Sequence, residues 1–317
     1  MKVIDRLKET DKTLFSFELL PPLKGRSLDD IFNSIDPLIE FDPININVTY
    51  HQQESVYRKR DDGLVERKIV RKRPGTLAIS SAIQSKYKIT VVPHIICGGF
   101  TKEETEDLLI DLQFLGMNNL LVLRGDPPQG TRDFIPVSGG HAHTNELVEQ
   151  ISNLNKGIYL EPNLKDPQAT DFSVGVAGYP EKHFESPNFA DDLFWLKKKV
   201  DAGADYIVTQ MFFDNNKFFQ FVELCRKEGI DVPIVPGLKP ITTLKDVEIL
   251  SRVFHIDIPQ DLVKEVRACE TNAEAKEVGV KWAIQQSKEL QANNVPAIHY
   301  YTICISDNIR KIAGEVF

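Results

Sequence analysis

Hydrophobic residues in this chain fall into short apolar runs, which alternate with longer segments where apolar positions recur every three or four residues. The short runs are rich in Val, Ile, Phe and Tyr and predict buried strands, whereas the longer segments predict amphipathic helices. The predicted strands are residues 13–20, 43–50, 89–97, 118–126, 171–180, 204–213, 232–240 and 296–305. The predicted helices include residues 27–41, 101–117, 190–204, 215–229 and 243–254, and the interval 259–295 is long enough for two more.

This alternation predicts an α/β fold, a (β/α)8 barrel of the TIM type, with an open doubly wound sheet as the competing arrangement. Local signals at helix ends agree with it. Thr101 and Glu104 have the spacing of a capping box. A glycine follows each of three predicted helices, at Gly116, Gly203 and Gly229. Because no Gly/Ser-rich linker or low-complexity stretch divides the sequence, we expect one domain with extra helices.

Charge and composition limit the classes of ligand. The 317 residues contain 38 Lys and Arg against 46 Asp and Glu, and the resulting charge of −8 gives no general attraction to nucleic acid or an anionic membrane. A small-molecule ligand is therefore expected. Four cysteines are scattered without the spacing of a zinc site or a disulfide framework: Cys97, Cys225, Cys269 and Cys304. With neither an apolar signal core nor a bilayer-spanning apolar run, the sequence predicts a soluble cytoplasmic protein.

Polar residues close every predicted strand. In a (β/α)8 barrel the active site forms at the C-terminal ends of the strands, so these residues are candidates for chemistry. Any one of them could be an ordinary solvent-facing residue, but polar ends on all strands favour a shared site. In order they are Glu18, Thr49, His94, Arg124 with Asp126, Tyr179, Gln210, Lys239 and Tyr301.

Two strand ends have distinctive sequences. In FSFELLPP, Glu18 is the only charge in an apolar run that Pro21 and Pro22 terminate. In LRGDPP, Gly125 permits a close backbone approach between the charged residues Arg124 and Asp126. The alternative for the second segment is an Arg–Asp pair that closes a turn.

Nine segments, taken in order along nearly the whole chain, resemble the methylenetetrahydrofolate reductase family. They are FSFELLPP, NVTY, VPHIIC, LRGDPP, GVAGYPEKH, DDLFWLKKKVDAGAD, TQMFFD, PIVPGLKPI and IHYYT. The resemblance implies FAD-dependent reduction of methylenetetrahydrofolate to methyltetrahydrofolate by NADH or NADPH, in the one-carbon metabolism that feeds methionine synthesis. It also implies that residues 1–317 are a catalytic barrel alone, as in bacterial members without a regulatory domain, and that the protein forms a homo-oligomer, either a dimer or a tetramer.

The resemblance further implies that FAD lies across the barrel mouth. Lys198 and Lys199 would meet the pyrophosphate and Asp192 the ribose side, while residues at strand ends would line the ring and the adjoining chain. For the two lysines alone, a solvated helix face is the alternative. The complete set of implied flavin contacts is Thr49, His94, Leu123, Arg124, Gly125, Asp126, Thr144, Tyr179, His183, Asp192, Lys198 and Lys199.

The implied reaction requires an acid, because the five-membered folate ring opens to an iminium cation only when the departing nitrogen takes a proton. We assign this proton to Glu18 and expect Phe17, Leu19 and Leu20 to raise its pKa by desolvation. Asp126 would stabilise the iminium, bind the pterin and lower the flavin potential. The resemblance makes Gln210 a substrate contact. An interior amide bonded to its neighbours is the alternative for Gln210.

Several positions depart from the family pattern. His143 and Thr144 stand where the family usually has Tyr and Ala, Leu244 replaces a substrate-stacking Phe, and Ile305 replaces an Arg. The His-Ala-His segment 141–143 suggests a metal, but without a third ligand in register a loop is favoured and no metal is expected.

Residues 58–74 form a basic stretch, which is most simply a solvated, salt-bridged loop and helix. A nucleic-acid patch, an oligomer contact and a cover for the flavin loop are its alternatives. For the whole chain, the competing functions are a flavin-independent barrel lyase or aldolase and a catalytically lapsed barrel that only binds folate or partners. A lyase would need a Schiff-base lysine or a metal cluster, and neither is evident.

Overall fold

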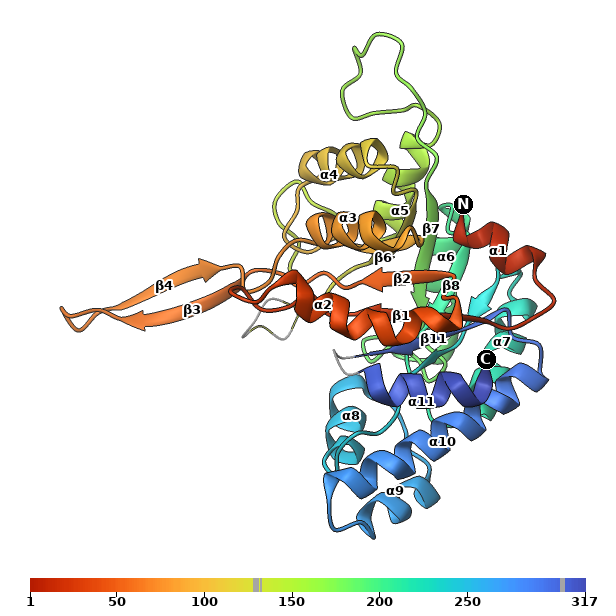
Figure 1. The fold of residues 1–317 in the computed structure, drawn as a ribbon. Coiled ribbons are helices and arrows are strands. Elements are labelled where there is room, and N and C mark those ends of the chain that lie inside the picture. The colour runs from red at the N-terminus through yellow and green to blue at the C-terminus, as the bar shows by residue number, and fades with distance from the viewer. Residues whose placement is uncertain (128–130, 132, 303–305) are drawn as a thin grey trace.

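Parallel strands surround the centre of the computed structural model, which describes residues 1–127, 131, 133–302 and 306–317 (Figure 1). The sheet order is β10-β11-β1-β2-β5-β6-β7-β8-β9. Its strands are β1 (Leu14–Leu19), β2 (Asn45–Val48), β5 (Val91–Ile96), β6 (Asn119–Leu123), β7 (Ser173–Gly178), β8 (Tyr206–Thr209), β9 (Ile234–Val235), β10 (Gly237–Leu238) and β11 (Ala297–Tyr301). Each predicted strand is present, and the prediction of a (β/α)8 barrel is confirmed over the open sheet.

The predicted seventh strand is interrupted at Pro236. Its first part, β9, pairs with β8, and its second part, β10, pairs with β11, so the two parts together complete the barrel. Proline has no N–H to donate to a strand ladder, which accounts for the interruption. The neighbouring strand uses the carbonyl instead, because the His299 N–H donates to the Pro236 oxygen at 2.9 Å.

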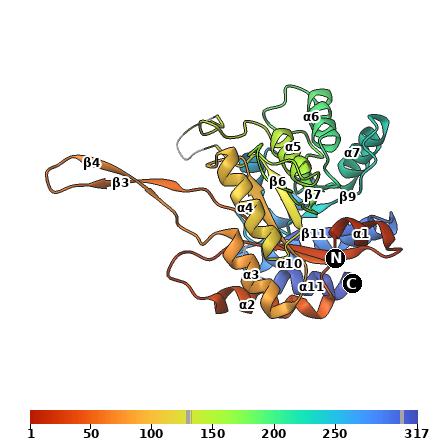
Figure 2. The same cartoon turned by 90° about the horizontal axis from the view of Figure 1, so that it is seen from above.

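Helices surround the barrel on its outside (Figure 2). The predicted segment 27–41 divides at Pro37 into an α-helix and a 3-10 helix, and segment 259–295 supplies two helices as expected. The helices are α1 (Val3–Glu9), α2 (Leu28–Ile35), η1 (Asp36–Phe41), α3 (Thr76–Tyr87), α4 (Lys102–Phe114), α5 (Thr144–Leu154), α6 (Phe189–Asp201), α7 (Asn215–Lys227), α8 (Asp246–Phe254), α9 (Gln260–Arg267), α10 (Asn272–Ala292) and α11 (Ser306–Val316).

The local signals at helix ends act as predicted. Thr101 and Glu104 form a complete capping box at the start of α4, with both reciprocal hydrogen bonds present. The three glycines that follow α4, α6 and α7 all have positive φ, a conformation that suits glycine: Gly116, Gly203 and Gly229.

The prediction of a loop and helix over residues 58–74 is wrong. Strands β3 (Glu54–Lys59) and β4 (Val65–Val70) form an antiparallel ribbon that projects from the barrel (Figures 1 and 2). Its turn is built on Gly63, whose φ is 83° and whose N–H donates to the Arg60 oxygen at 3.0 Å. An Asp-Asp-Gly turn between two half-apolar runs is a hairpin signal, which the density of charge had obscured.

The core leaves one end of the barrel for polar side chains. Helix α1 covers the N-terminal end, where Val3, Ile4 and Leu7 pack with inward residues of the strands such as Val92 and Val208. Asn119, the first residue of β6, accepts a hydrogen bond from the Val3 N–H of α1 at 2.7 Å. A group of buried polar residues lies farther along the strands: Ser16, Asn47, His94 and His299 with Asn45. This group gives the inside of the barrel a polar character toward the C-terminal strand ends.

Two helical glycines allow a matched test of packing. A Cβ on Gly279 of α10 would overlap the backbone of Ile241, whereas the nearest atom to a Cβ on Gly314 of α11 is 3.9 Å away. We expect Gly279→Ala to destabilise the protein by about 2 kcal/mol through overpacking. Gly314→Ala should stabilise it by about 0.5 kcal/mol through helix propensity. Urea unfolding measures both changes, and a neutral Gly279→Ala would contradict this packing.

None of the described helices combines the length and the apolar character that a membrane-spanning segment requires.

Candidate active site

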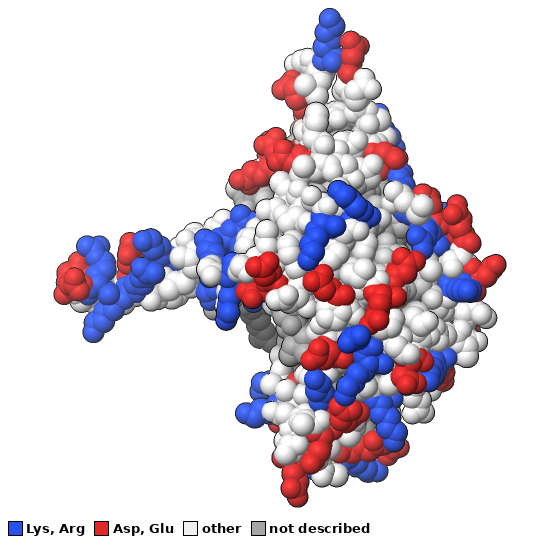
Figure 3. Space-filling model, in the orientation of Figure 1, with Lys and Arg blue, Asp and Glu red and all other residues white. Residues whose placement is uncertain are grey.

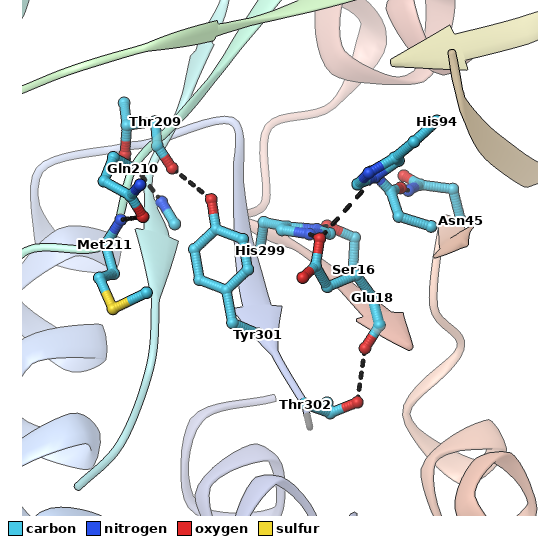
Figure 4. A network of polar contacts seen from close by, with 12 residues as sticks. Ser16, Glu18, Asn45, His94, Thr209, Gln210, Met211, His299, Tyr301 and Thr302 are labelled. Carbon is cyan, nitrogen blue, oxygen red and sulfur yellow. Dashed lines mark hydrogen bonds and ion pairs between the residues drawn. The ribbon is translucent and has the colours of Figure 1, made fainter. Parts of the chain in front are cut away.

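Glu18 lies at the C-terminal mouth of the barrel, between two buried histidines (Figure 4). Its Oε2 is 3.7 Å from His94 Nε2 and 3.8 Å from His299 Nε2. Strand alternation turns Glu18 inward and sends Phe17 and Leu19 to the helix side, where both pack in the main core. The expected desolvation by Phe17 and Leu19 is therefore wrong, because imidazoles surround the carboxylate instead.

Burial keeps His94 in its neutral form, and an asparagine amide contacts its ring. Asn45 Nδ2 donates to Asn47 Oδ1 at 2.6 Å, so the Asn47 amide is turned to offer its N–H to His94 Nε2 at 3.3 Å. Burial lowers the pKa of His94 to about 4, although the nearby Glu18 favours the charged form. His94 is thus an uncharged neighbour of Glu18 near neutral pH.

His299 keeps one ring nitrogen free on the side of Glu18. Its Nδ1 shares a 2.9 Å hydrogen bond with Ser16 Oγ, whereas its Nε2 is buried without a hydrogen-bond partner in the described structure. Tyr301 was predicted as the polar residue that closes its strand, and His299 was not predicted. The signal was available, because His299 precedes Tyr301 by two positions and so lies on the same face of β11.

The backbone around Glu18 is fixed from both sides. The Thr302 hydroxyl donates to the Glu18 carbonyl, and Arg73 donates to the carbonyl of Pro21 at the strand exit. These two hydrogen bonds hold the strand exit that carries the Glu18 carboxyl at the mouth.

Lys239 lies at the neighbouring strand end. Burial lowers the pKa of its ammonium group, while Asp246 and Glu18 act in the opposite direction.

A second group of charges follows β6 and β7. Arg124 forms a bidentate pair with Glu185, at 2.7 and 2.6 Å, and this pair raises the pKa of Arg124 and lowers that of Glu185. The structure therefore does not support the alternative of an Arg124–Asp126 turn. Glu185 was missed, since a loop acid gives no periodic signal. Tyr179 and His183 lie beside it with ring centroids 4.7 Å apart.

Gly125 brings the next loop close to the mouth. Its φ is 88°, and a Cβ there would be 3.0 Å from Gln52 Nε2 and 3.3 Å from Ile96 Cδ1. Gln52 Nε2 donates to the Asp126 carbonyl at 3.0 Å. The Asp126 side chain remains exposed. Gln52 was not predicted, because it lies in a loop.

Of the two predicted flavin-binding lysines, Lys199 is held against β7 and Lys198 is exposed to solvent. Lys199 Nζ donates to the Ala177 carbonyl of β7 at 2.5 Å, and burial lowers its pKa to about 8. Lys198 is exposed and lies over the ring of Phe194 at 5.4 Å. Asp192 is buried and accepts a hydrogen bond from Ser186 Oγ at 2.8 Å. The structure brings Lys199 to the C-terminal end of β7 and leaves Lys198 in solvent.

The remaining predicted contact residues form few interactions with their neighbours. Thr49 Oγ1 is buried and has no hydrogen-bond partner among the described residues, and Leu123 ends β6. The side-chain carbonyl of Gln210 accepts a hydrogen bond from the Met211 N–H at 3.0 Å, which leaves its NH2 group without a partner in the described part of the chain (Figure 4). Leu244 packs against the cluster around α8 and α9.

The His-Ala-His segment has a structural role. His141 is buried and shares a hydrogen bond with Gln150 Oε1, while His143 caps α5 and stacks on Trp195 with centroids 5.3 Å apart. Thr144 is the first residue of α5. In the described part of the chain, no three His, Cys, Asp or Glu side chains are placed to hold a metal. The departure at Ile305 lies outside the described residues.

The fold and this cluster define a class: a (β/α)8-barrel protein whose candidate site lies at the C-terminal strand ends, with a carboxylate among buried imidazoles and a cation at one side. Comparison with known proteins then specifies the family. The family model described as methylenetetrahydrofolate reductase matches residues 3–316, so the chain belongs to the methylenetetrahydrofolate reductase family.

Two individual relatives carry the same family name. The chain is 33% identical to methylenetetrahydrofolate reductase (NADH) 1 of Arabidopsis thaliana over 96% of its own length and 48% of the relative. It is 28% identical to the 5,10-methylenetetrahydrofolate reductase of Escherichia coli, covering 91% of this chain and 85% of that one. The chain therefore spans about half the length of its plant relative and most of the bacterial one.

A solved structure supports the fold. A protein from Clostridium thermocellum, described as uncharacterized and as binding two copies of 5-methyl-5,6,7,8-tetrahydrofolic acid, superposes with a TM-score of 0.59 at 14% identity. The match covers 98% of this chain and 96% of that one. At this level of identity the match extends to the arrangement of strands and helices only.

Proposed function

We propose that this protein reduces methylenetetrahydrofolate to methyltetrahydrofolate, with FAD as the bound cofactor and NADH or NADPH as the electron donor. The observation that carries the proposal is the position of Glu18, which lies at the barrel mouth of a chain in this family with its carboxyl between His94 and His299. Opening the five-membered ring of this folate needs a proton donor beside the bound substrate, and the Glu18 carboxyl at the barrel mouth can supply it.

The residues at the mouth fit a flavin. Thr49 offers a buried hydroxyl that has no partner among the described residues, Gly125 allows close approach of the chain, and Lys199 supplies a cation for a pyrophosphate. Tyr179 and His183 would contact the cofactor from the loop after β7, and Asp192 would orient its ribose side. When bound, FAD supplies the hydride that the bridging carbon of the folate accepts.

Glu18 would act on the folate nitrogen that leaves when the five-membered ring opens. Its carboxylic acid gives up a proton to that nitrogen, and the folate becomes an iminium cation. The neutral His94 adds no positive charge that would oppose this cation. Asp126 would stabilise the cation and bind the pterin, and the free amide end of Gln210 would hold the substrate.

Purified protein tests this function directly. We expect a yellow protein whose flavin absorbance bleaches anaerobically with NADH or NADPH and returns when methylenetetrahydrofolate is added. A colourless protein that cannot be reconstituted with flavin would favour a barrel lyase. Bound flavin that folate never reoxidises would favour a barrel that only binds folate.

The two lysines offer a test of the cofactor site. Lys199→Gln should weaken FAD binding by about tenfold, since a partly buried cation near a phosphate contributes more than an exposed one. Lys198→Gln is the matched control and should change it little, because Lys198 is exposed. Lys199 carries charge only below its pKa of about 8, so wild-type affinity should fall as the pH rises through this value.

Fluorescence titration of the apoprotein with FAD measures these affinities. Equal losses in both variants, or a pH profile that persists in Lys199→Gln, would speak against this orientation of the cofactor.

We place this reaction in the cytoplasm, in the one-carbon metabolism that supplies methyl groups for methionine. The free thiols of Cys97, Cys225 and Cys269 suit a reducing compartment.

A further inference from the structure

The β3–β4 ribbon, residues 54–70, forms an arm that stands apart from the barrel as its own two-stranded sheet (Figures 1 and 2). Its base is anchored. The Lys24 N–H donates to the Lys72 carbonyl at 2.9 Å, Lys72 pairs with Glu54, and Gln52 is bonded to the loop at the mouth. A two-stranded ribbon alone is marginally stable in water, so a projecting arm of this length calls for a partner.

One face of the arm carries three exposed apolar side chains. Directly opposed residues point to the same side of a ribbon. Tyr57, Val65 and Ile69 share one side and are 67%, 65% and 63% exposed. This face is formed by the pairs Ser55–Ile69, Tyr57–Arg67 and Lys59–Val65, and the opposite face by Glu54–Val70, Val56–Lys68 and Arg58–Glu66. The three large side chains therefore make a stripe that no layer covers in the described part of the chain.

The arm carries its net positive charge on the face with the apolar stripe. Residues 54–70 contain five Lys or Arg against four Asp or Glu, but the strand pairs of that face include Lys59 and Arg67 and no acid, whereas Glu54 and Glu66 lie on the opposite face. Three more basic residues follow at the base, so residues 54–74 have a formal charge of +4 and the rest of the chain has −12. Figure 3 shows Lys and Arg side chains spread along the projecting arm. Opposite charge on the body and the arm of one chain makes a second copy an electrostatically complementary partner.

Helix α4 presents a matching surface. Glu103, Asp107 and Asp111 follow one another at four-residue spacing on its exposed side, and Phe114, which is 88% exposed, continues the same face. Like charges at this spacing destabilise a helix, and none of the three carboxylates forms an ion pair within the described residues. The face combines unpaired acids with an exposed aromatic ring.

We propose that the arm of one copy lies along α4 of a second copy. Lys59 and Arg67 would meet the carboxylates, and the apolar stripe would cover Phe114. The lengths are compatible, since the stripe from Val65 to Ile69 spans about 14 Å of strand and the face from Glu103 to Phe114 spans about 17 Å of helix.

Two further arguments favour α4 as the partner of the arm. Packing two arms face to face would bring Lys59 and Arg67 against their own copies, which like charges oppose. A reciprocal exchange of arms repeats the contact and closes a two-fold dimer.

Charge reversal of the full-length chain tests this contact. Lys59→Glu with Arg67→Glu should weaken self-association by about tenfold or more, and Asp107→Lys with Asp111→Lys should do the same. The four changes together should restore association to near the wild-type level, because the pairing is re-formed with opposite sign. Sedimentation velocity over a micromolar concentration range measures each dissociation constant.

Apolar substitutions give the matched control. Tyr57→Thr with Ile69→Thr should also weaken association about tenfold. Val56→Thr with Val70→Thr, on the opposite face, should leave it near wild type. Circular dichroism and the melting temperature show whether each variant is folded.

Four results would overturn the proposal. The wild-type protein could be a monomer, the charge reversals could leave the dimer unchanged, or the combined four-fold variant could fail to restore association. In the fourth, reversal of Lys59 and Arg67 would abolish binding of a single-stranded oligonucleotide while the dimer persists. None of these outcomes depends on flavin or folate, so the proposed catalytic function can fail or stand separately.

Discussion

Glu18→Gln should lose folate reduction by about 10²-fold or more while it keeps bound flavin and most of its reduction by nicotinamide. Glutamine has nearly the same shape as glutamate but has no acidic proton to transfer. The two histidines should hold the amide where the carboxyl was, and the Thr302 hydroxyl should still bind the backbone carbonyl of residue 18. The loss should therefore appear in the step that opens the folate ring and not in the step that reduces the flavin.

Anaerobic stopped-flow separates these two half-reactions. Flavin bleaching by NADH or NADPH reports the first, and reoxidation by methylenetetrahydrofolate reports the second. Glu223→Gln, an exposed change on α7, is the control for removing a carboxylate and should alter neither rate. Equal losses in both half-reactions of Glu18→Gln would contradict its role as the acid.

Asp126→Asn should raise the flavin reduction potential and slow the folate half-reaction by about 10²-fold. A carboxylate near the ring disfavours added negative charge on a reduced flavin and favours a cationic iminium. Asp126 lies in the loop that Gly125 and Gln52 hold at the mouth. Burial raises the pKa of Tyr179 there, and the negative charges of Asp192 and Asp126 act in the same direction.

A redox titration with a dye of known potential measures the first effect, and stopped-flow measures the second. An unchanged potential would place Asp126 away from the ring. A raised potential together with a normal folate rate would instead remove its proposed contact with the iminium.

Periodicity and caps were sufficient to predict the barrel. Thr101 marks the start of a helix, and Gly116, Gly203 and Gly229 mark helix ends. The strand order follows from the right-handed βα alternation. The break at Pro236 was also present in the sequence, since proline cannot donate to the ladder. The arm was missed because charged residues on both strands hide the alternation that places Tyr57 and Ile69 on one face.

The candidate site was predicted unevenly for a physical reason. Strand ends converge in space by topology, so Glu18 and His94 could be placed together from sequence. The partners that surround them depend on which way each side chain faces. Alternation alone would have moved Phe17 away from Glu18 and brought His299 toward it. Loop residues such as Glu185 follow no period and require the structure.

A crystal structure of the protein with flavin and folate bound tests the central claim most directly. We expect the pterin to stack over the flavin at the barrel mouth, with a Glu18 carboxyl oxygen within about 3.2 Å of the folate nitrogen that leaves on ring opening. A pterin bound elsewhere, or a Glu18 carboxyl turned away from it into solvent, would rule out Glu18 as the acid.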